Sequence, residues 1–335
     1  MRFTTRARLA AATLTALALL AACSKDSGPP GQQRVEPPAI CPLLGIKPPG
    51  GSVPDRPALA VKVENLPEVR PQTGLSFADI IYEEPVEGGI TRFIVIYQCR
   101  DASRIEPIRS ARFTDVDVLA QYGRPLFAFA GGVRAVFDRI KKAQIVDVNY
   151  NVKEAASAYH RDPNKPAPHN LYSSTKDLYA AAKGETGVPN AIFAYSAQNP
   201  TGRRVTTLHV PFSGFSDVFW KWSATRKAYL RSHGDVPHTY SDGKQVASTN
   251  VVVQVVKLVQ TKIKDAAGNP SPEAISIGTG KAYILRGGHM TIGTWRRRTV
   301  GDLTKFYDRT GKEVHLLPGN TWVELVPSTV TVLYK

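Results

Sequence analysis

The sequence predicts an α+β protein, with a mixed α/β N-terminal domain followed by a mostly antiparallel β domain. Two observations predict this division. In the first half, β-prone runs alternate with segments whose apolar residues recur at helical spacing. In the second half, short β-rich runs follow one another and are separated by turns. The polar stretch 198–216 lies between the halves, so we expect domains at residues 41–200 and 217–335.

The N-terminal domain is expected to begin with three strands. Residues 58–64 alternate partly between apolar and polar side chains, as a half-buried strand does. Residues 79–87 and 90–99 are β-prone and flank Gly88-Gly89, a pair that favours a tight turn. We therefore predict a hairpin from the second and third strands.

Helices and a further strand follow in the same domain. A short helix is predicted over residues 115–119, because acidic side chains occupy its first turn. Residues 126–130 are typical of a short buried strand, and residues 133–143 have apolar side chains at helical spacing. Ser174 or Thr175 is expected to cap a last helix.

The C-terminal domain is predicted from a series of short β-rich runs. These runs are residues 218–222, 227–231, 250–259, 281–286, 290–296 and 321–326. Turn-forming residues separate them, which indicates antiparallel connections. We expect a small barrel or a strongly bent sheet.

The N-terminus has the parts of an export signal, because a basic start is followed by an uncharged apolar run. That run is shorter than the about 20 apolar residues of a membrane span. The sequence Leu20-Ala21-Ala22-Cys23 then resembles a bacterial lipobox. We expect residues 1–22 to be a lipoprotein signal peptide, after which Cys23 carries palmitate and other acyl chains. An ordinary secretory signal cut at Ala22 is the alternative.

Residues 23–40 are rich in Pro, Gly and Gln, which is the composition of a flexible tether. Several acyl chains on Cys23 would anchor the protein firmly in the lipid bilayer. We therefore expect an exported protein that is lipid-anchored to the extracytoplasmic face of a bacterial membrane.

The chain is basic, with a formal net charge of +15, or +12 without the three arginines of the signal. A basic exterior attracts nucleic acid, an anionic membrane surface or an anionic wall polymer, and it also keeps a protein soluble. Export argues against nucleic acid, so an anionic wall polymer or an envelope protein is the expected partner besides the bilayer. The sequence has no Walker or dinucleotide fingerprint and no thiol-based zinc pattern, so no cofactor and no metal are expected.

After Cys23, the sequence contains two further cysteines, Cys41 and Cys99. Two cysteines in an exported domain are usually paired. Their disulfide would join the start of the folded part to the end of a strand, and closing this loop would contribute on the order of 4 kcal/mol. Two free buried thiols are the alternative.

The N-terminal domain carries a dense set of polar side chains close to its predicted strands. Charged groups so near a core must be solvated, paired or used. The candidate residues are Glu64, Asn65, Arg70, Glu83, Glu87, Arg92, Arg109, Arg112, Asp115, His169 and Tyr172. They fit either an internal network of arginines and carboxylates or a cleft for an anionic or sugar-like ligand.

Parts of this set favour particular chemistry. Arg109 and Arg112 have planar guanidinium groups that can bind an anion through two parallel hydrogen bonds. Glu83 and Glu87 share a face of an ideal strand, and paired carboxylates support glycoside chemistry. His169 lies in a loop, where a histidine is more often a hydrogen-bonding residue than a catalyst.

Two features lie outside that set. His233 and His238 flank a turn and give a weak signal for a metal site. Trp295 precedes three arginines, and on an alternating strand Trp295 and Arg297 face one side and Arg296 and Arg298 the other. We expect the tryptophan in the core and the arginines in water. A site for an anionic wall or membrane polymer is the alternative for the arginines.

Several motifs resemble the YerB-like lipoprotein family, which is catalogued as a domain of unknown function. They include Asp55-Arg56-Pro57, Lys62-Val63-Glu64-Asn65, Arg70-Pro71-Gln72-Thr73-Gly74-Leu75, Glu87-Gly88-Gly89-Ile90-Thr91-Arg92-Phe93, Arg109-Ser110-Ala111-Arg112, Pro168-His169-Asn170-Leu171-Tyr172, Gly293-Thr294-Trp295 and Thr321-Trp322. Ile105-Glu106-Pro107 departs from the family pattern, which has Gly where this chain has Glu106. The resemblance implies an exported lipoprotein with two domains and implies no activity.

We therefore expect a membrane-anchored extracytoplasmic lipoprotein that binds a cell-envelope component or a partner protein. The alternative is an envelope polysaccharide hydrolase or transferase that uses carboxylates near Glu83 and Glu87. The sequence alone leaves open whether the protein is an enzyme. Carboxylates that are buried and matched to arginines would favour a structural network, whereas an open cleft would favour catalysis.

Overall fold

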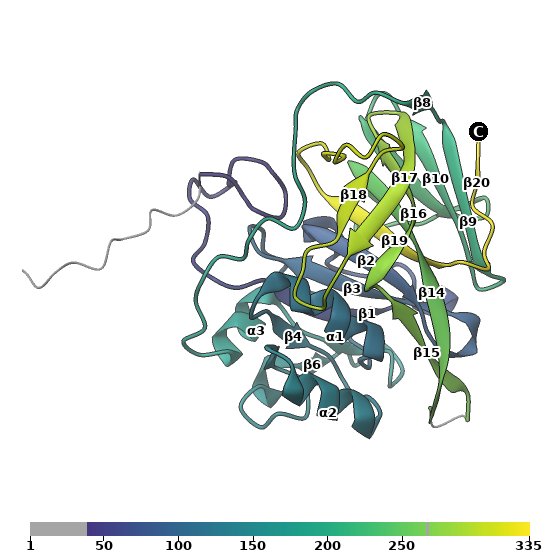
Figure 1. Ribbon diagram of the computed structural model, residues 1–335. Coiled ribbons are helices and arrows are strands. Elements are labelled where there is room, and N and C mark those ends of the chain that lie inside the picture. Colours follow the sequence, from purple (N-terminus) through teal and green to yellow (C-terminus); the bar gives the residue numbers. More distant parts are fainter. Residues whose placement is uncertain (1–38, 266–267) are drawn as a thin grey trace, which may run out of the picture. The chain divides into compact units, whose positions relative to one another are not determined.

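The computed structural model describes residues 39–265 and 268–335 (Figure 1). The predicted signal peptide, the lipidation site Cys23 and nearly all of the predicted tether lie outside the described residues.

A large mixed sheet forms the centre of the fold. Its N-terminal strands are β1 (Leu59–Glu64), β2 (Ile80–Pro85), β3 (Thr91–Tyr97), β4 (Leu126–Ala128) and β5 (Val146–Asp147). The predicted hairpin is confirmed, because β2 and β3 pair antiparallel across a turn at Glu87–Gly89. Gly88 and Gly89 both have positive φ angles there, which explains why glycine occupies both positions.

Strands from the second half of the chain extend the same sheet. They are β8 (Arg203–Arg204), β14 (Asn250–Lys264), β15 (Pro270–Ile275), β16 (Gly278–Arg286), β17 (His289–Arg297), β18 (Lys305–Tyr307) and β19 (Thr321–Pro327). The main order is β18-β17-β16-β14-β19-β2-β3-β1-β4-β5. Figure 1 shows the green and yellow strands next to the blue strands of the first half.

Strand β19 joins the two halves of the chain, because it pairs parallel with β14 on one side and with β2 on the other. The second half is therefore not purely antiparallel. The first five residues of β14 and all residues of β19 are buried, as expected for strands covered on both faces.

A smaller antiparallel sheet covers one face of the large sheet. Its strands are β9 (Thr207–Ser213), β10 (Ser216–Ser223), β11 (Ala228–His233), β12 (Val236–Pro237), β13 (Ala247–Ser248) and β20 (Leu333–Tyr334). Trp220 of β10 is fully buried and meets Trp322 of β19 edge to face, with ring centroids 5.2 Å apart. Such aromatic contacts join the two sheets through a shared apolar core.

Helices pack against the large sheet. They are α1 (Phe113–Leu119), α2 (Arg134–Lys142) and α3 (Thr175–Ala181). The predicted cap is confirmed at Ser174, whose hydroxyl accepts a hydrogen bond from the backbone N–H of Asp177 at 3.0 Å. Val136 and Ile140 of α2 lie in the core cluster on the second face of the sheet, with Val116 of α1.

Several short elements complete the described fold. They are the two-stranded pair β6 (His160–Arg161) and β7 (Leu171–Tyr172), and 3-10 turns at Pro67–Val69, Leu75–Phe77, Ala120–Tyr122 and Ala156–Ala158. None of the helices within residues 39–265 and 268–335 is long and apolar enough to cross a membrane.

The predicted disulfide is present. Cys41 and Cys99 are bonded, with their Cα atoms 5.9 Å apart. The bridge lies in a small buried cluster with Leu44 and Val53. It therefore fastens the start of the described chain to the residues that follow β3.

Candidate functional site

Glu83 lies in the interior, between the two sheets, and not in an open cleft. It is fully buried on β2, and its Oε2 receives a hydrogen bond from Arg231 Nη2 at 2.5 Å. Its Oε1 accepts hydrogen bonds from Thr91 Oγ1 at 2.6 Å and from Asn65 Nδ2 at 3.2 Å. A carboxylate with three protein donors is held as a structural anion.

Arg231, on β11 of the smaller sheet, is the cation that the sequence analysis missed. Its guanidinium group is fully buried over the rings of Phe93, Trp220 and Trp322, at 5.0 to 5.9 Å from their centroids. The signal was present in the sequence, because Arg231 occupies an inward position of an alternating strand. Its partner Glu83 could not be chosen from spacing alone, since 148 positions separate the two residues.

The two histidines that were weak candidates for a metal site accept hydrogen bonds from Arg231 instead. Arg231 Nη1 donates hydrogen bonds to His233 Nε2 at 2.6 Å and to His238 Nδ1 at 2.5 Å. Since arginine can only donate, His238 carries its proton on Nε2 and donates it to Gln72 Oε1 at 2.7 Å. Burial and the nearby charge of Arg231 keep the pKa of His238 well below its usual value, so the ring is neutral.

A second buried acid, Glu324 on β19, lies beside this group and was also missed. Trp220 Nε1 donates a hydrogen bond to its Oε1 at 2.7 Å. Burial, and then the negative charge of Glu83, raises the pKa of Glu324 well above its usual value. This shift favours the neutral form of Glu324, which lies beside the ion pair of Glu83 and Arg231.

Glu64 forms a second group with two predicted residues. Its fully buried carboxylate meets Arg109 Nε at 2.9 Å through Oε1 and His169 Nδ1 at 2.7 Å through Oε2. The side chains of Arg109 and His169 are 20% and 26% exposed, so these two contacts reach the surface.

Glu87 and Arg112 form a third group. Arg112 Nε and Nη2 lie 2.7 and 2.5 Å from Glu87 Oε2, and Ser271 of β15 donates to the second oxygen. Burial alone would raise the pKa of Glu87, but the charge of Arg112 and the hydrogen bonds from Arg112 and Ser271 together outweigh burial and lower that pKa. Glu87 and Glu83 have no partner in common. The two side chains were expected on one face of a continuous strand, but Glu87 lies in the turn at Glu87–Gly89 and not on the strand.

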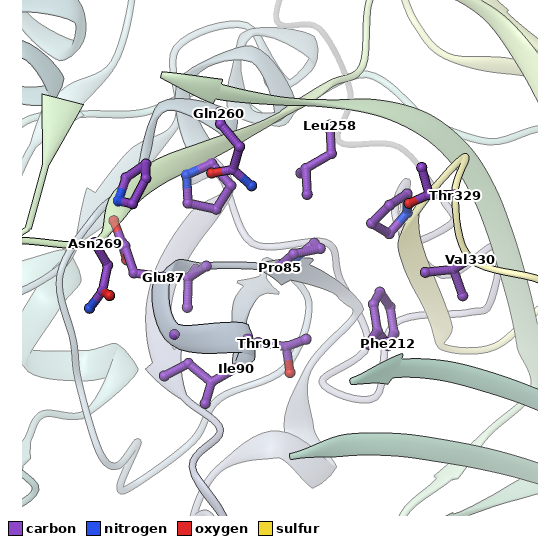
Figure 2. Close-up of a pocket in the computed structure, with 16 residues that line it drawn as sticks. Pro85, Glu87, Ile90, Thr91, Phe212, Leu258, Gln260, Asn269, Thr329 and Val330 are labelled. Carbon is purple, nitrogen blue, oxygen red and sulfur yellow. The ribbon is translucent and has the colours of Figure 1, made fainter. Parts of the chain in front are cut away.

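Glu87 also lines a groove of about 410 Å³ between the β2–β3 turn, β14 and the segment after β19 (Figure 2). The walls combine polar groups with apolar side chains such as Pro85, Leu258, Phe212 and Val330. Since the Glu87 carboxylate is held by Arg112 and Ser271, it is not a free acid or base in this groove.

Arg92 lies between the second and third groups. It is nearly buried and donates from Nη1 to the carbonyl oxygen of Ser110 at 3.1 Å. Burial, and then the charges of Arg112 and Arg109, lowers the pKa of Arg92 to about 10. Among the described residues it forms no ion pair.

Asp115, on α1, belongs to a separate buried triad with Lys62 and Glu84. Its Oδ1 lies 2.7 Å from Lys62 Nζ, and its Oδ2 accepts the backbone N–H of Arg112 at 2.6 Å. Glu84 is the third member and pairs with the same Lys62. Burial raises the pKa of Glu84 to about 7, although Lys62 opposes the shift.

Tyr172 is not part of these groups. Its ring contacts the guanidinium group of Arg104, whose carbon lies 3.7 Å from the ring centroid, and the ring of His160. The structure therefore assigns Tyr172 to a surface cation–π pair.

A further cavity of about 410 Å³ is lined by Arg70, Lys165 and His169, together with Pro71, Pro107, Pro166, Glu68, Val69, Thr73 and Ser241. We call it the His169 cavity. Arg70 donates to Asn65 Oδ1 at 3.1 Å and to its carbonyl oxygen at 2.8 Å, and it has no ion pair among the described residues. Burial, and then the charge of Arg231, lowers the pKa of Arg70 to about 10.

The expectation for the arginines after Trp295 was partly wrong. Trp295 is buried, as predicted, and Arg296 and Arg298 are exposed. Arg297, however, is buried and donates to the carbonyl oxygens of Asp302 at 3.0 Å and Asp117 at 2.6 Å. It faces the same side of β17 as the tryptophan, so strand parity takes it into the interior.

No group of three or more His, Cys, Asp or Glu side chains in residues 39–265 and 268–335 is arranged to hold a metal ion. In the same part of the chain, the carboxylates of Glu64, Glu83 and Glu87 each meet an arginine. The fold and site thus define a class of mixed-sheet protein with an interior network of ion pairs and ligand-sized cavities at its surface.

The comparisons identify the family. The model for the N-terminal domain of DUF3048, a protein family of unknown function, matches residues 44–188, and the model for its C-terminal domain matches residues 208–323. The chain belongs to the DUF3048 family.

A curated relative and a solved structure agree with this assignment. The chain is 29% identical over 322 residues to YerB of Bacillus subtilis (strain 168), whose name marks it as an inferred lipoprotein, with 92% of each chain covered. The crystal structure of YerB protein from Bacillus subtilis matches with a TM-score of 0.75 at 25% identity, covering 88% of this chain and 99% of that chain.

Proposed function

We propose that this protein is a lipid-anchored extracytoplasmic lipoprotein that works by binding an anionic cell-envelope component. The sequence Leu20-Ala21-Ala22-Cys23 and the name of the Bacillus subtilis relative support the anchor. The charge of +12 without the signal arginines supports attraction to an anionic wall polymer.

The ligand site in this proposal is the His169 cavity. The observation that carries it is Arg70, a half-buried guanidinium group that lines the cavity without an ion pair among the described residues. Lys165 and His169 line the same cavity, whereas Glu68 is its one acidic lining residue. An anionic group bound there would receive charge-assisted hydrogen bonds.

A hydrolase or transferase that uses Glu83 and Glu87 is the weaker alternative. Acid–base catalysis needs a carboxyl group within reach of substrate. Glu83 is fully buried against Arg231, and Glu87 is held by Arg112. Binding without turnover is therefore the function that the geometry supports best.

Saturable binding is the measurement that tests the proposal. The full chain, purified in detergent, would be titrated with soluble anionic wall polymer at low and high salt. Arg70→Gln/Lys165→Gln should weaken binding more than about tenfold, since two charge-assisted hydrogen bonds are lost. Glu106, the partner of Lys165, keeps Arg104 as a cation in this variant.

Lys153→Gln/Lys183→Gln is the matched control, because it removes two positive charges from exposed positions outside the cavity. Equal losses in both variants would mean general charge attraction and would contradict the cavity assignment. Absence of polymer binding would favour an envelope protein as the partner. Breakdown of the polymer would restore the enzyme alternative, with His169 as the first residue to replace.

A further inference from the structure

A second cavity, of about 520 Å³, lies among strands of the C-terminal half. Its walls come from β8, the ends of β16 and β17, the turn after β18, and β20. We call it the Arg286 cavity. No residue of the predicted polar set lines it, so it is separate from the His169 cavity.

Positive charge dominates this cavity. Four cationic side chains line it, namely Arg203, Arg286, Arg309 and Lys312. None of the four has an ion pair with a described carboxylate. The four cations outnumber the two carboxylates that line the same cavity, so the walls keep a net positive charge.

The two acidic lining residues are already engaged. Asp308 Oδ1 accepts backbone N–H groups of Thr310 at 2.8 Å and Lys312 at 3.0 Å, as in a tight turn. Glu313 Oε2 lies 3.2 Å from Lys305 Nζ, outside the cavity lining. Neither carboxylate forms an ion pair with an arginine of the cavity.

Arg286 is the most informative of the four cations. It is half-buried at the end of β16, and one of its nitrogens donates to the carbonyl oxygen of His315. Its Nε is buried and has no hydrogen-bond partner among the described residues. Burial lowers the pKa of Arg286, because a guanidinium group that leaves water without an anion loses solvation.

The other lining residues indicate what kind of molecule would carry an anionic group into this cavity. Thr201 and Thr291 supply hydroxyl groups, while Met290 and Val314 form a buried apolar floor. Tyr334 lies under Arg203, whose guanidinium carbon is 5.4 Å from the ring centroid. Guanidinium forks match phosphate geometry, and hydroxyls and an aromatic ring suit a sugar or polyol.

We propose that the Arg286 cavity binds a phosphate group carried on a sugar or polyol. The cavity volume of about 520 Å³ accommodates a ligand of that size. Arg286 and Arg203 contact the phosphate oxygens, and the exposed Arg309 and Lys312 attract the anion to the entrance.

Calorimetric titration of the full chain with glycerol 3-phosphate tests this. The expected result is saturable binding that Arg309→Gln/Lys312→Gln weakens about tenfold, with free glycerol not bound at the same concentrations. Both residues are exposed, so the variant keeps its fold. Arg286→Lys keeps the charge but removes the fork, and it should weaken binding by a similar factor.

The matched control is Arg298→Gln/Lys221→Gln, which removes two charges from exposed positions outside the cavity. This control should bind within about twofold of the unaltered chain. Equal weakening in both double variants, or no saturable binding of glycerol 3-phosphate, would overturn the proposal. Variants of the His169 cavity should leave this binding unchanged, so the two proposals fail independently.

Two sources can present the same phosphate chemistry to an extracytoplasmic protein. Competition with a soluble glycerol phosphate polymer and with phosphatidylglycerol vesicles distinguishes them. Competition by the polymer identifies a wall component, and competition by the vesicles identifies a lipid headgroup. Failure of both to compete with glycerol 3-phosphate would contradict a phosphodiester ligand.

Discussion

The interior network and the surface cavity each contain a central arginine, Arg231 and Arg286, and the two arginines differ in their counter-ions. Arg231 is fully buried, and Glu83 supplies its counter-ion at 2.5 Å. Arg286 is half-buried, and no described carboxylate pairs with it. The difference is that a carboxylate neutralises the arginine between the two sheets, whereas no described carboxylate pairs with the arginine at the surface cavity.

The physical reason lies in the cost of desolvation. A fully buried ion loses several kcal/mol of hydration, which a well-placed opposite charge or several hydrogen bonds must offset. A half-buried arginine next to a cavity retains part of its hydration and can exchange water for an anion. Stability should therefore depend strongly on the first region and weakly on the second.

The largest effect is expected from Arg231→Met. This change leaves the carboxylate of Glu83 buried without its cation, and it should lower the free energy of unfolding by about 3 to 5 kcal/mol. Urea unfolding followed by tryptophan fluorescence measures the loss. Arg231→Met/Glu83→Gln should recover part of it, since no buried charge then remains unpaired. A loss below about 1 kcal/mol in the single variant would contradict the claim that stability depends strongly on the interior ion pair.

An intermediate effect is expected from the dependence of stability on pH. Burial raises the pKa of Glu84 to about 7, above its usual value of 4.5. Between these values the folded state keeps a proton that the unfolded state releases, so this group stabilises the fold below about pH 4.5 and loses that contribution as the pH rises through about 7.

Glu84→Gln removes this titration and keeps a neutral side chain of similar shape. The difference in unfolding free energy between the unaltered chain and the variant should change by up to about 3 kcal/mol between about pH 5 and pH 8. Asp79 and Glu324, whose pKa values are also raised by burial, are present in both proteins and cancel in this difference. Parallel pH profiles would mean that Lys62 holds Glu84 ionised throughout.

The smallest effect is expected at the Arg286 cavity. Arg309→Gln/Lys312→Gln alters two exposed side chains without ion pairs, so the free energy of unfolding should change by less than about 0.5 kcal/mol in the absence of ligand. A gain in stability would mean that the four cations repel one another, so that the cavity lowers stability whereas the interior ion pair raises it. A loss above about 1 kcal/mol would show that these residues serve the fold.

Much of the local structure could be predicted because neighbouring residues determine it. The hairpin over β2 and β3 follows from β-prone runs around Gly88-Gly89, and α3 follows from its Ser174 cap. The disulfide followed from the presence of two cysteines in an exported chain, and the structure confirms it.

The candidate site was predicted only in part. The sequence identified Glu64, Glu83 and Glu87 as unusual, and all three are buried beside arginines. It could not predict which cation meets which anion. The Arg286 cavity escaped notice altogether, because its lining residues are scattered from Thr201 to Tyr334.

The sequence by itself determined the local elements, the charge of the chain and the polar character of the segments around β1, β2 and β3. Only the tertiary structure decided that β19 lies between β14 and β2, and that Arg231 reaches Glu83 from the second sheet. Local elements depend on propensities and turns within a few residues, whereas ion-pair partners depend on strand order and register. Whether a charged group is a structural ion or a ligand contact depends on its burial, which only the packed fold determines.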